Sequence, residues 1–442
     1  MTVNTEIPPN ESTDEAEIMD STTEPTLNSS RTFSDVKITY DKHKIYSLVP
    51  HTDNQTFALR ILLKNPKGLK FLTFKFVKGR EVRIMVSEEK YHILEKFTKK
   101  HGFIKKVVVH NVQHLINAQV SILVGEEFSF HKYYGLVQIY EYMKSLVSVH
   151  YKYVTHLVIG NSYEGRAIRG VKISYKKNNP GVFIEAGTHA REWIAPATAL
   201  YIINELLTSK DRKIRSIAEN YDFYIFPCVN PDGYEYSHQV DRMWRKTRRP
   251  ITERCTGVDA NRNFGFHFEA DEDDHCSEIY PGPHAFSEPE TKHLADFVKR
   301  NRKNIQVYLD FHSFSQLLMF PYGYTYDHVP NYDQLYRIGR RAAAALKSVY
   351  GTEYGVGDIA EAICKRDNIS LDYMYGELGI PFCYVYELRD KGQTGMLLPP
   401  EQIIPTGRET LASIIAMLQD TYISARIDHE RKKIETILDD IF

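Results

Sequence analysis

Residues 182–194 read VFIEAGTHAREWI, and the interpretation of the whole chain starts from this stretch. Its apolar beginning predicts a buried strand, and His189 and Glu192 follow at the mouth of a predicted helix. Two further strand candidates end in a similar way, one running into His312 and one into Glu387. Because ligands of open α/β sheets gather beyond the carboxyl ends of the strands, we expect these four side chains to share one cleft.

Two histidines and one carboxylate form a common zinc-binding set that leaves one coordination position for water. A second carboxylate nearby is suited to act as a general base on the attacking water. Each residue also has an ordinary interpretation. A single His-x-x-Glu pair usually lies on a solvated helix face, a single His312 is more often a core or capping residue, and Glu387 beside Arg389 and Asp390 suits a salt-bridged loop. The pattern alone leaves both interpretations open.

Residues 128–425 are expected to form the large domain, an α/β unit with a mixed sheet between layers of helices. Apolar strand-like runs alternate with helical stretches along this region. The predicted strands are His156–Ile159, Val171–Tyr175, Val182–Ala186, Tyr221–Pro227, Gln306–Phe311 and Phe382–Tyr386. The predicted helices are Tyr134–Ser148, Pro196–Leu207, Glu288–Lys299, Tyr332–Tyr350 and Pro405–Tyr422.

Residues 36–118 are expected to form a separate small domain with the element order β-α-β-β-α-β. This order predicts a ferredoxin-like α+β fold, a four-stranded sheet with two helices on one face. A hairpin signal lies at residues 78–80, and Gly102 is expected to end the second helix. The predicted strands are residues 44–50, 71–77, 82–86 and 107–112, and the predicted helices are residues 56–63 and 87–101.

The remaining segments carry no folded domain in this interpretation. Residues 1–35 are expected to be a disordered acidic tail, since residues 1–30 hold seven acidic side chains and no Lys or Arg. Residues 119–127 are expected to be a linker, and residues 426–442 a charged helical tail. The start shows no basic segment and no apolar run of about 7–15 residues, as a signal peptide would have. Either the protein stays inside the cell or a leader is missing from this start.

The composition argues against several classes of protein. The chain has 442 residues, and 56 Lys and Arg against 57 Asp and Glu give a formal net charge of −1. Neither nucleic acid nor an anionic membrane surface is therefore an expected partner. No apolar run reaches the ~18 residues that a membrane span needs. The five cysteines are too few for a disulfide scaffold and lack zinc-finger spacing.

Six short motifs in order give the chain a resemblance to a known family. They are GTHAREWI at 187–194, VDANRNF at 258–264, HSFSQ at 312–316, YELRD at 386–390, MLLP at 396–399 and QIIP at 402–405. Together they resemble the carboxypeptidase A/B-type zinc metallocarboxypeptidases, over residues 128–422. The resemblance implies a mixed eight-stranded sheet flanked by helices. The small domain resembles the activation segment of the procarboxypeptidases, which lies over the cleft of the zymogen.

The resemblance assigns the metal site and the chemistry. It implies that His189, Glu192 and His312 bind one Zn²⁺, and that Asp259 hydrogen-bonds a ligand histidine and fixes its tautomer. Glu387 matches the general base, which takes a proton from water and delivers one to the leaving amine.

Arg245 lies in a basic stretch, residues 242–249, for which a solvated loop or a polyanion-binding patch is the ordinary interpretation. By resemblance, Arg245 stabilises the oxyanion of the tetrahedral intermediate.

The resemblance also implies how a peptide is held. Asn261 and Arg262 match the pair that grips the terminal carboxylate, for which a guanidinium fork is well shaped. This contact would make the enzyme an exopeptidase whose substrates are peptide or protein C-termini. Ser313, beside His312, and Arg191 match further substrate-binding positions. For Arg191 a surface salt bridge is the alternative.

Two positions bear on substrate binding in particular. Cys364 stands where the family has a tyrosine that caps the pocket and hydrogen-bonds the terminal carboxylate. Leu371 stands where relatives specific for basic residues carry Asp, which favours release of apolar or aromatic residues, although Asp310 and Glu361 lie nearby in the sequence. The alternative function is a catalytically weak or inactive peptide-binding relative, because Cys364 replaces the tyrosine.

Cys255 and Cys276 match the family's disulfide, which closes a short loop and implies an oxidising compartment. On this ground we expect a secreted protein made as a zymogen and activated by another protease. No clear basic processing site is visible between residues 117 and 128. We expect a monomer.

Overall fold

The small domain is a four-stranded antiparallel sheet with helices. The computed structural model describes residues 36–74, 76–119, 128–270 and 274–439, with side chains up to residue 421. Thr52 begins the first helix by accepting a hydrogen bond from the Gln55 N–H, and Gly102, in a left-handed conformation, ends the second. The sheet order is β2-β3-β1-β4, and the elements are β1 Lys44–Leu48, α1 Asp53–Lys64, β2 Lys70–Phe71, β3 Val82–Val86, α2 Tyr91–His101, β4 Lys105–Val109 and α3 Val112–Gln119. The expected order β-α-β-β-α-β is confirmed.

The second strand of this domain is much shorter than predicted. A strand was expected over residues 71–77, but β2 covers only Lys70–Phe71. The Leu72 N–H still donates to the carbonyl oxygen of Arg83 in β3 at 2.9 Å, and the Leu72 side chain is buried in a hydrophobic cluster with Met243 and Met396 of the large domain. The chain beyond Phe71 therefore packs against the large domain instead of continuing as a long strand.

The end of the small domain also differs from the prediction. Strand β4 ends at Val109, and helix α3, which was not predicted, follows and ends at Gln119, inside the expected linker. The buried side chain of Gln119 donates to the carbonyl oxygen of Leu398 at 2.8 Å and accepts from Arg242 at 2.9 Å. The remainder of the expected linker, residues 120–127, lies outside the described residues, as does the expected tail over residues 1–35.

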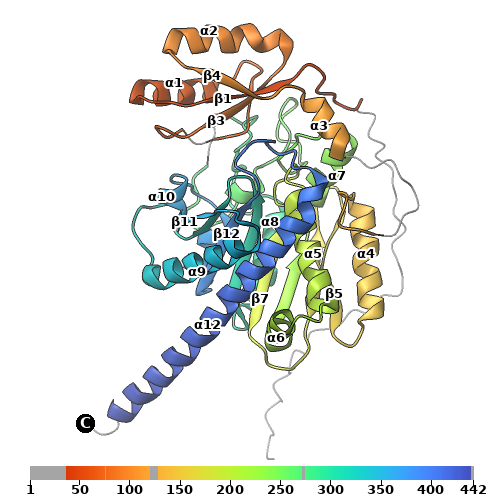
Figure 1. Ribbon diagram of the computed structural model, residues 1–442, viewed down its shortest axis with the longest axis vertical. Coiled ribbons are helices and arrows are strands. Elements are labelled where there is room, and N and C mark those ends of the chain that lie inside the picture. The colour runs from red at the N-terminus through yellow and green to blue at the C-terminus, as the bar shows by residue number, and fades with distance from the viewer. Residues whose placement is uncertain (1–35, 75, 120–127, 271–273, 440–442) are drawn as a thin grey trace, which may run out of the picture. The chain divides into compact units, whose positions relative to one another are not determined.

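The large domain is built on one mixed sheet of eight strands in the order β11-β10-β12-β9-β7-β8-β6-β5. Figure 1 labels β5, β7, β11 and β12 of this sheet. The four central strands, β12, β9, β7 and β8, are parallel to one another. On either side of them, β10 pairs antiparallel with β12 and β6 pairs antiparallel with β8. The bounds are β5 Val154–Asn161, β6 Ala167–Ile173, β7 Gly181–Ala186, β8 Asp222–Phe226, β9 Ile305–Ser313, β10 Leu317–Phe320, β11 Gly355–Asp358 and β12 Phe382–Leu388. The expected mixed eight-stranded sheet flanked by helices is confirmed.

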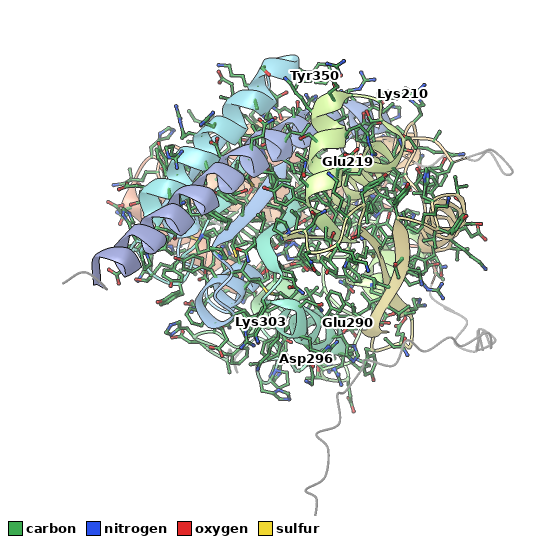
Figure 2. All side chains as sticks on the ribbon, turned by 90° about the horizontal axis from the view of Figure 1, so that it is seen from below. Lys210, Glu219, Glu290, Asp296, Lys303 and Tyr350 are labelled. Carbon is green, nitrogen blue, oxygen red and sulfur yellow. A yellow bond between two sulfur atoms is a disulfide. The ribbon has the colours of Figure 1, made fainter. Side chains whose placement is uncertain are left out.

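Two hydrophobic cores cover the two faces of this sheet. Val182, Ile184 and Ala186 of β7 belong to one core and Phe183 to the other, as the alternation of a strand requires. The first core includes α4, α5, α6, α9 and α12, and helices α9 and α12 pack side by side within it (Figure 2). The helix bounds are α4 Leu136–Val149, α5 Ile194–Thr208, α6 Arg212–Asn220, α7 Pro231–Gln239, α8 Pro289–Asn301, α9 Tyr332–Tyr350, α10 Ile359–Ala362, α11 Ser370–Asp372 and α12 Ile403–Asp439.

The strands and helices that were predicted for this domain are present, helix α9 with the predicted bounds and the others with shifted ends, whereas β10, β11, α6, α7, α10 and α11 were not predicted. Strands β10 and β11 have four residues each, too few for a clear alternation pattern. The charged helix expected over residues 426–442 forms, as far as Asp439, the end of the continuous helix α12. Among the described residues, no helix has the length and apolar character needed to cross a bilayer.

Candidate metal centre

A tight turn after β7 brings His189 and Glu192 together. Gly187 makes the turn with a φ of +73°, and a Cβ there would lie 3.0 Å from the Cα of Cys228, so only glycine suits this position. The Glu192 N–H then donates to the carbonyl oxygen of His189 at 3.2 Å. This geometry places His189 Nδ1 2.9 Å from Glu192 Oε1, and both side chains are buried.

His312, near the end of strand β9, is the third residue of the cluster. His312 Nδ1 lies 2.9 Å from Glu192 Oε2, so the Nδ1 atoms of both histidines face one carboxylate. The three side chains are buried, and their donor atoms lie within 4.8 Å of one another. Zinc fits this donor set, because two imidazole nitrogens and a carboxylate converge while the opposite ring nitrogens are engaged elsewhere.

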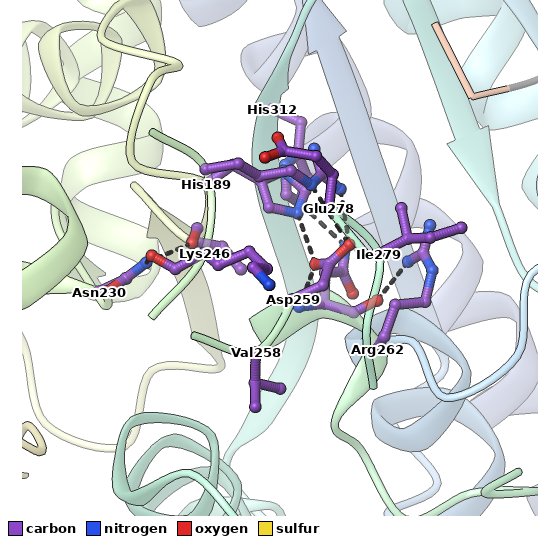
Figure 3. A network of polar contacts seen from close by, with 12 residues as sticks. His189, Asn230, Lys246, Val258, Asp259, Arg262, Glu278, Ile279 and His312 are labelled. Atoms are coloured by element: carbon purple, nitrogen blue, oxygen red, sulfur yellow. Dashed lines mark hydrogen bonds and ion pairs between the residues drawn. The ribbon is translucent and has the colours of Figure 1, made fainter. Parts of the chain in front are cut away.

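Those opposite ring nitrogens each face a buried aspartate, and Figure 3 shows the contact of His189 with Asp259. His189 Nε2 lies 3.0 Å from Asp259 Oδ1, and His312 Nε2 lies 3.0 Å from Asp310 Oδ2. The Ser370 hydroxyl donates to the same Asp310 oxygen at 3.0 Å. A carboxylate behind each imidazole holds the ring in place and increases its basicity as a metal ligand.

Glu387 lies beside the cluster, since it pairs with His312 in the register of β12 and β9. Burial and the negative charge of Glu192 raise the pKa of Glu387 to about 8, against the opposing effects of His312 and Arg245. A cation bound by the neighbouring ligands would favour the ionised carboxylate and lower this pKa.

Arg245 lies at the edge of the same cluster and is buried. Its Nη2 donates to Asp259 Oδ2 at 2.8 Å, and its Nη1 lies 3.7 Å from Glu192 Oε1. Burial alone would raise the pKa of Asp259, but Arg245 and His189 hold it well below its usual range. Asp259 is therefore ionised at neutral pH.

One cleft contains the metal cluster, Glu387 and Arg245. Its apolar wall is formed by Met319, Ile359, Ile363, Ile369 and Val385, and its other polar lining residues include Asn261, Arg262, Ser313 and Arg366. Leu72, Thr73 and Phe74 of the small domain also line it, and the Phe74 ring centroid lies 5.3 Å from the guanidinium carbon of Arg245.

Three of the predicted substrate-binding residues are not among those that line the cleft. Arg191 is fully buried and donates to Glu278 at 2.9 Å and to the carbonyl oxygen of Met243 at 3.3 Å. Leu371 lies in the hydrophobic core, and Cys364 is a half-buried free thiol next to the lining residue Ile363.

The predicted disulfide between Cys255 and Cys276 is present, with Cα atoms 4.8 Å apart. Cys228 and Cys383 are free and buried. The disulfide joins the segment before Asn261 and Arg262 to the segment after them.

Asp310 and Phe74 were not recognised from the sequence as neighbours of the metal cluster. The sequence suggested for Asp310 only a role in attracting basic substrates. Its position two residues before His312 on a strand was the available signal, because residues i and i+2 point to the same face. No local pattern points to Phe74, which reaches the cleft from a different domain.

Comparison with known proteins agrees with this geometry. The family model described as zinc carboxypeptidase matches residues 139–413, and the model described as carboxypeptidase activation peptide matches residues 46–119. A zinc carboxypeptidase from Simulium vittatum is 51% identical over 294 residues, 66% of this chain and 97% of the relative. Zinc carboxypeptidase A 1 from Anopheles gambiae is 39% identical over 401 residues, 89% of this chain and 92% of the relative.

Among solved structures, the carboxypeptidase A of Helicoverpa armigera superimposes with a TM-score of 0.79 at 29% identity, over 88% of this chain and 100% of that one. The match of the family model covers more than half of the chain and includes the buried cluster of His189, Glu192 and His312. The chain therefore belongs to the zinc carboxypeptidase family and is a carboxypeptidase A-like peptidase that carries an activation peptide.

Proposed function

We propose that this enzyme hydrolyses the last peptide bond of peptides and proteins and releases single apolar or aromatic amino acids. The observation that carries the proposal is that the metal cluster and Glu387 share one cleft with Asn261, Arg262 and an apolar wall. Groups suited to bond cleavage thus lie beside groups suited to a terminal carboxylate and an apolar side chain. These are the elements that an exopeptidase needs.

In the proposed reaction, Glu387 takes a proton from the attacking water and later delivers a proton to the leaving amine. Zinc, when bound, supplies a Lewis acid that polarises the scissile carbonyl and makes the water more acidic. Arg245 donates hydrogen bonds to the developing oxyanion from a site where water is largely excluded. Asp259 holds both His189 and Arg245 in position, through the contacts at 3.0 and 2.8 Å.

Arg262 and Asn261 are proposed to grip the terminal carboxylate. The Asn261 side-chain oxygen accepts from the Ser370 N–H at 2.9 Å, which leaves its amide group oriented toward His312. Ser313 is proposed as a further contact to the peptide, since it lines the same cleft. Arg191 is proposed to support the site by anchoring Glu278 rather than by touching substrate, because its buried guanidinium donates to Glu278 and faces the Phe74 ring at 5.9 Å.

We propose that the chain is secreted as a monomeric zymogen, in which Leu72, Thr73 and Phe74 obstruct the cleft until another protease removes the small domain. The contacts of these three residues in the cleft and the disulfide between Cys255 and Cys276 support this proposal.

The direct test is to cleave the chain between residues 119 and 128 and to follow amino-acid release from blocked dipeptides. We expect release after cleavage and little before it. If the processed protein binds zinc and blocked dipeptides but releases nothing, the alternative of a non-catalytic peptide-binding relative replaces the proposal.

The first prediction concerns specificity. C-terminal Phe or Leu should be released faster than Arg, by at least about tenfold in kcat/KM, because a cationic side chain would be desolvated against the apolar wall without a partner. The Arg366 guanidinium in the cleft adds like-charge repulsion. An Arg366→Gln variant should reduce the preference for Phe over Arg but keep its direction. Faster release of Arg than of Phe by the unaltered enzyme would contradict the prediction.

The second prediction concerns Cys364. Replacing Cys364 by Tyr should lower KM more than it raises kcat, because the phenol restores a hydrogen bond to the terminal carboxylate, worth roughly 1.5–3 kcal/mol. Cys364→Phe is the matched control, since it adds the ring without the hydroxyl. Steady-state kinetics on one blocked dipeptide measure the difference. Restored turnover with an unchanged KM would show that the residue acts on the chemical step instead.

A further inference from the structure

A second cluster of metal-ligating side chains lies outside the catalytic cleft. It comprises Asp358 at the end of β11, Glu361 in α10, and His328, which lies before α9 (Figure 1 labels these elements). Its ligand atoms lie within 4.8 Å of one another, as in the catalytic cluster. Nε2 of His328 is 3.8 Å from Asp358 Oδ2 and 3.7 Å from Glu361 Oε1.

Asp358 supplies an acceptor that has no hydrogen-bond partner among the described residues. Its side chain is only 4% exposed, and Oδ1 accepts from the Glu361 N–H at 2.8 Å. Oδ2 is also buried, yet no described group donates a hydrogen bond to it. A buried carboxylate oxygen without a partner is costly, so this atom is prepared for a ligand that the protein itself does not provide.

The ring of His328 is held in place by stacking. Its centroid lies 3.7 Å from that of Tyr332 with an interplanar angle of 7°. The contact fixes the imidazole plane while the side chain remains 47% exposed, so an ion from solvent has access to Nε2. Preorientation of a ligand ring lowers the entropic cost of metal binding.

The distances favour a bridging ion over direct pairing. At 3.7 and 3.8 Å the imidazole is too far from either carboxylate for a hydrogen bond, and an exposed ion pair of this length contributes little to stability. Ligand bonds of about 2.0–2.2 Å around a tetrahedral zinc ion place neighbouring ligand atoms roughly 3.4 Å apart. The observed spacing is therefore close to that of three ligands around one ion.

We propose that His328, Asp358 and Glu361 bind a second divalent cation of the zinc type, with water completing the coordination. An imidazole together with two carboxylates favours such a metal over Mg²⁺ or Ca²⁺, which prefer oxygen ligands alone. Two of the three ligand side chains, His328 and Glu361, are exposed, so the affinity of this site is lower than that of the buried catalytic cluster. The proposal does not depend on the reaction that the enzyme catalyses.

The position of this site links it to the cleft. Ile359, adjacent to Asp358, and Ile363, two residues after Glu361, both line the apolar wall. A bound cation would tie this segment to the region of His328. A cation bound at this site is thus expected to hold the apolar wall of the cleft in place.

Zinc titration of the full-length chain tests the proposal. Starting from protein with one tightly bound zinc, calorimetry with zinc chloride and metal analysis after equilibrium dialysis should detect one additional ion per chain. His328→Ala and Glu361→Gln should each weaken this second binding by at least tenfold and leave the first ion in place. His114→Ala, which removes an exposed histidine on α3, is the matched control and should bind two ions.

The outcomes separate clearly. His312→Ala should lose the tight ion but keep the weaker one, which distinguishes the two sites. Competition by excess Mg²⁺ should not displace the second zinc. The proposal is wrong if the unaltered chain binds only one zinc at about 100 μM free metal, or if His328→Ala still binds two as tightly as the control.

Discussion

Replacement of Glu387 by Gln is expected to lower kcat by about 10²–10⁴-fold while zinc content and thermal stability stay unchanged. Gln has nearly the same shape as Glu, so it fills the same space beside His312 on the neighbouring strand. Its amide cannot take up a proton at neutral pH, and the attacking water then has no base. Turnover of a blocked dipeptide, measured together with metal content, gives the result.

The pH dependence provides a second readout of Glu387. The base must be ionised, so kcat/KM should fall as the pH is lowered through its apparent pKa. Burial and Glu192 raise that pKa to about 8 in the absence of metal, and a bound cation lowers it, so the midpoint is expected below this value. Glu387→Asp is the control, because it keeps the carboxylate but moves it away and should retain part of the activity. A Gln variant with unaltered turnover would remove Glu387 as the base.

Replacement of His312 by Ala is expected to abolish tight binding at the catalytic centre and, with it, peptidase activity. His312 is one of only three side chains in this cluster, and its loss leaves the buried Glu192 carboxylate with a single imidazole partner. Loss of a group behind a ligand typically costs about 10–100-fold in metal affinity, and loss of the ligand itself should cost considerably more. Elemental analysis after dialysis measures the zinc that remains.

Asp310→Asn provides the matched control for this experiment. It keeps His312 but replaces the carboxylate that lies 3.0 Å from its Nε2 atom. We expect zinc affinity to fall by about 10–100-fold in this variant, less than in His312→Ala. If His312→Ala held zinc at the catalytic centre as tightly as the unaltered protein, the assignment of the three ligands would be wrong.

The sequence alone was sufficient for those features that are encoded in contiguous motifs. The stretch over residues 187–194 contains both His189 and Glu192, and the turn that joins them needs only local geometry and Gly187. The long central strands were predictable because each is a continuous apolar run buried on both faces. Once these strands were identified, the rule that parallel strands end at one edge of the sheet predicted that His312 and Glu387 lie close together.

Only the tertiary structure decided the features that depend on contacts between distant segments. Just beyond the second strand of the small domain, the Leu72 side chain is buried against Met243 and Met396 of the large domain, and no pattern within residues 71–77 reveals these partners. Likewise, Arg366 lines the cleft while Leu371 lies in the core, although both belong to one short segment. Local sequence carries periodicity and the identity of reactive groups, but the direction of a loop side chain is set by whichever surface packs against it.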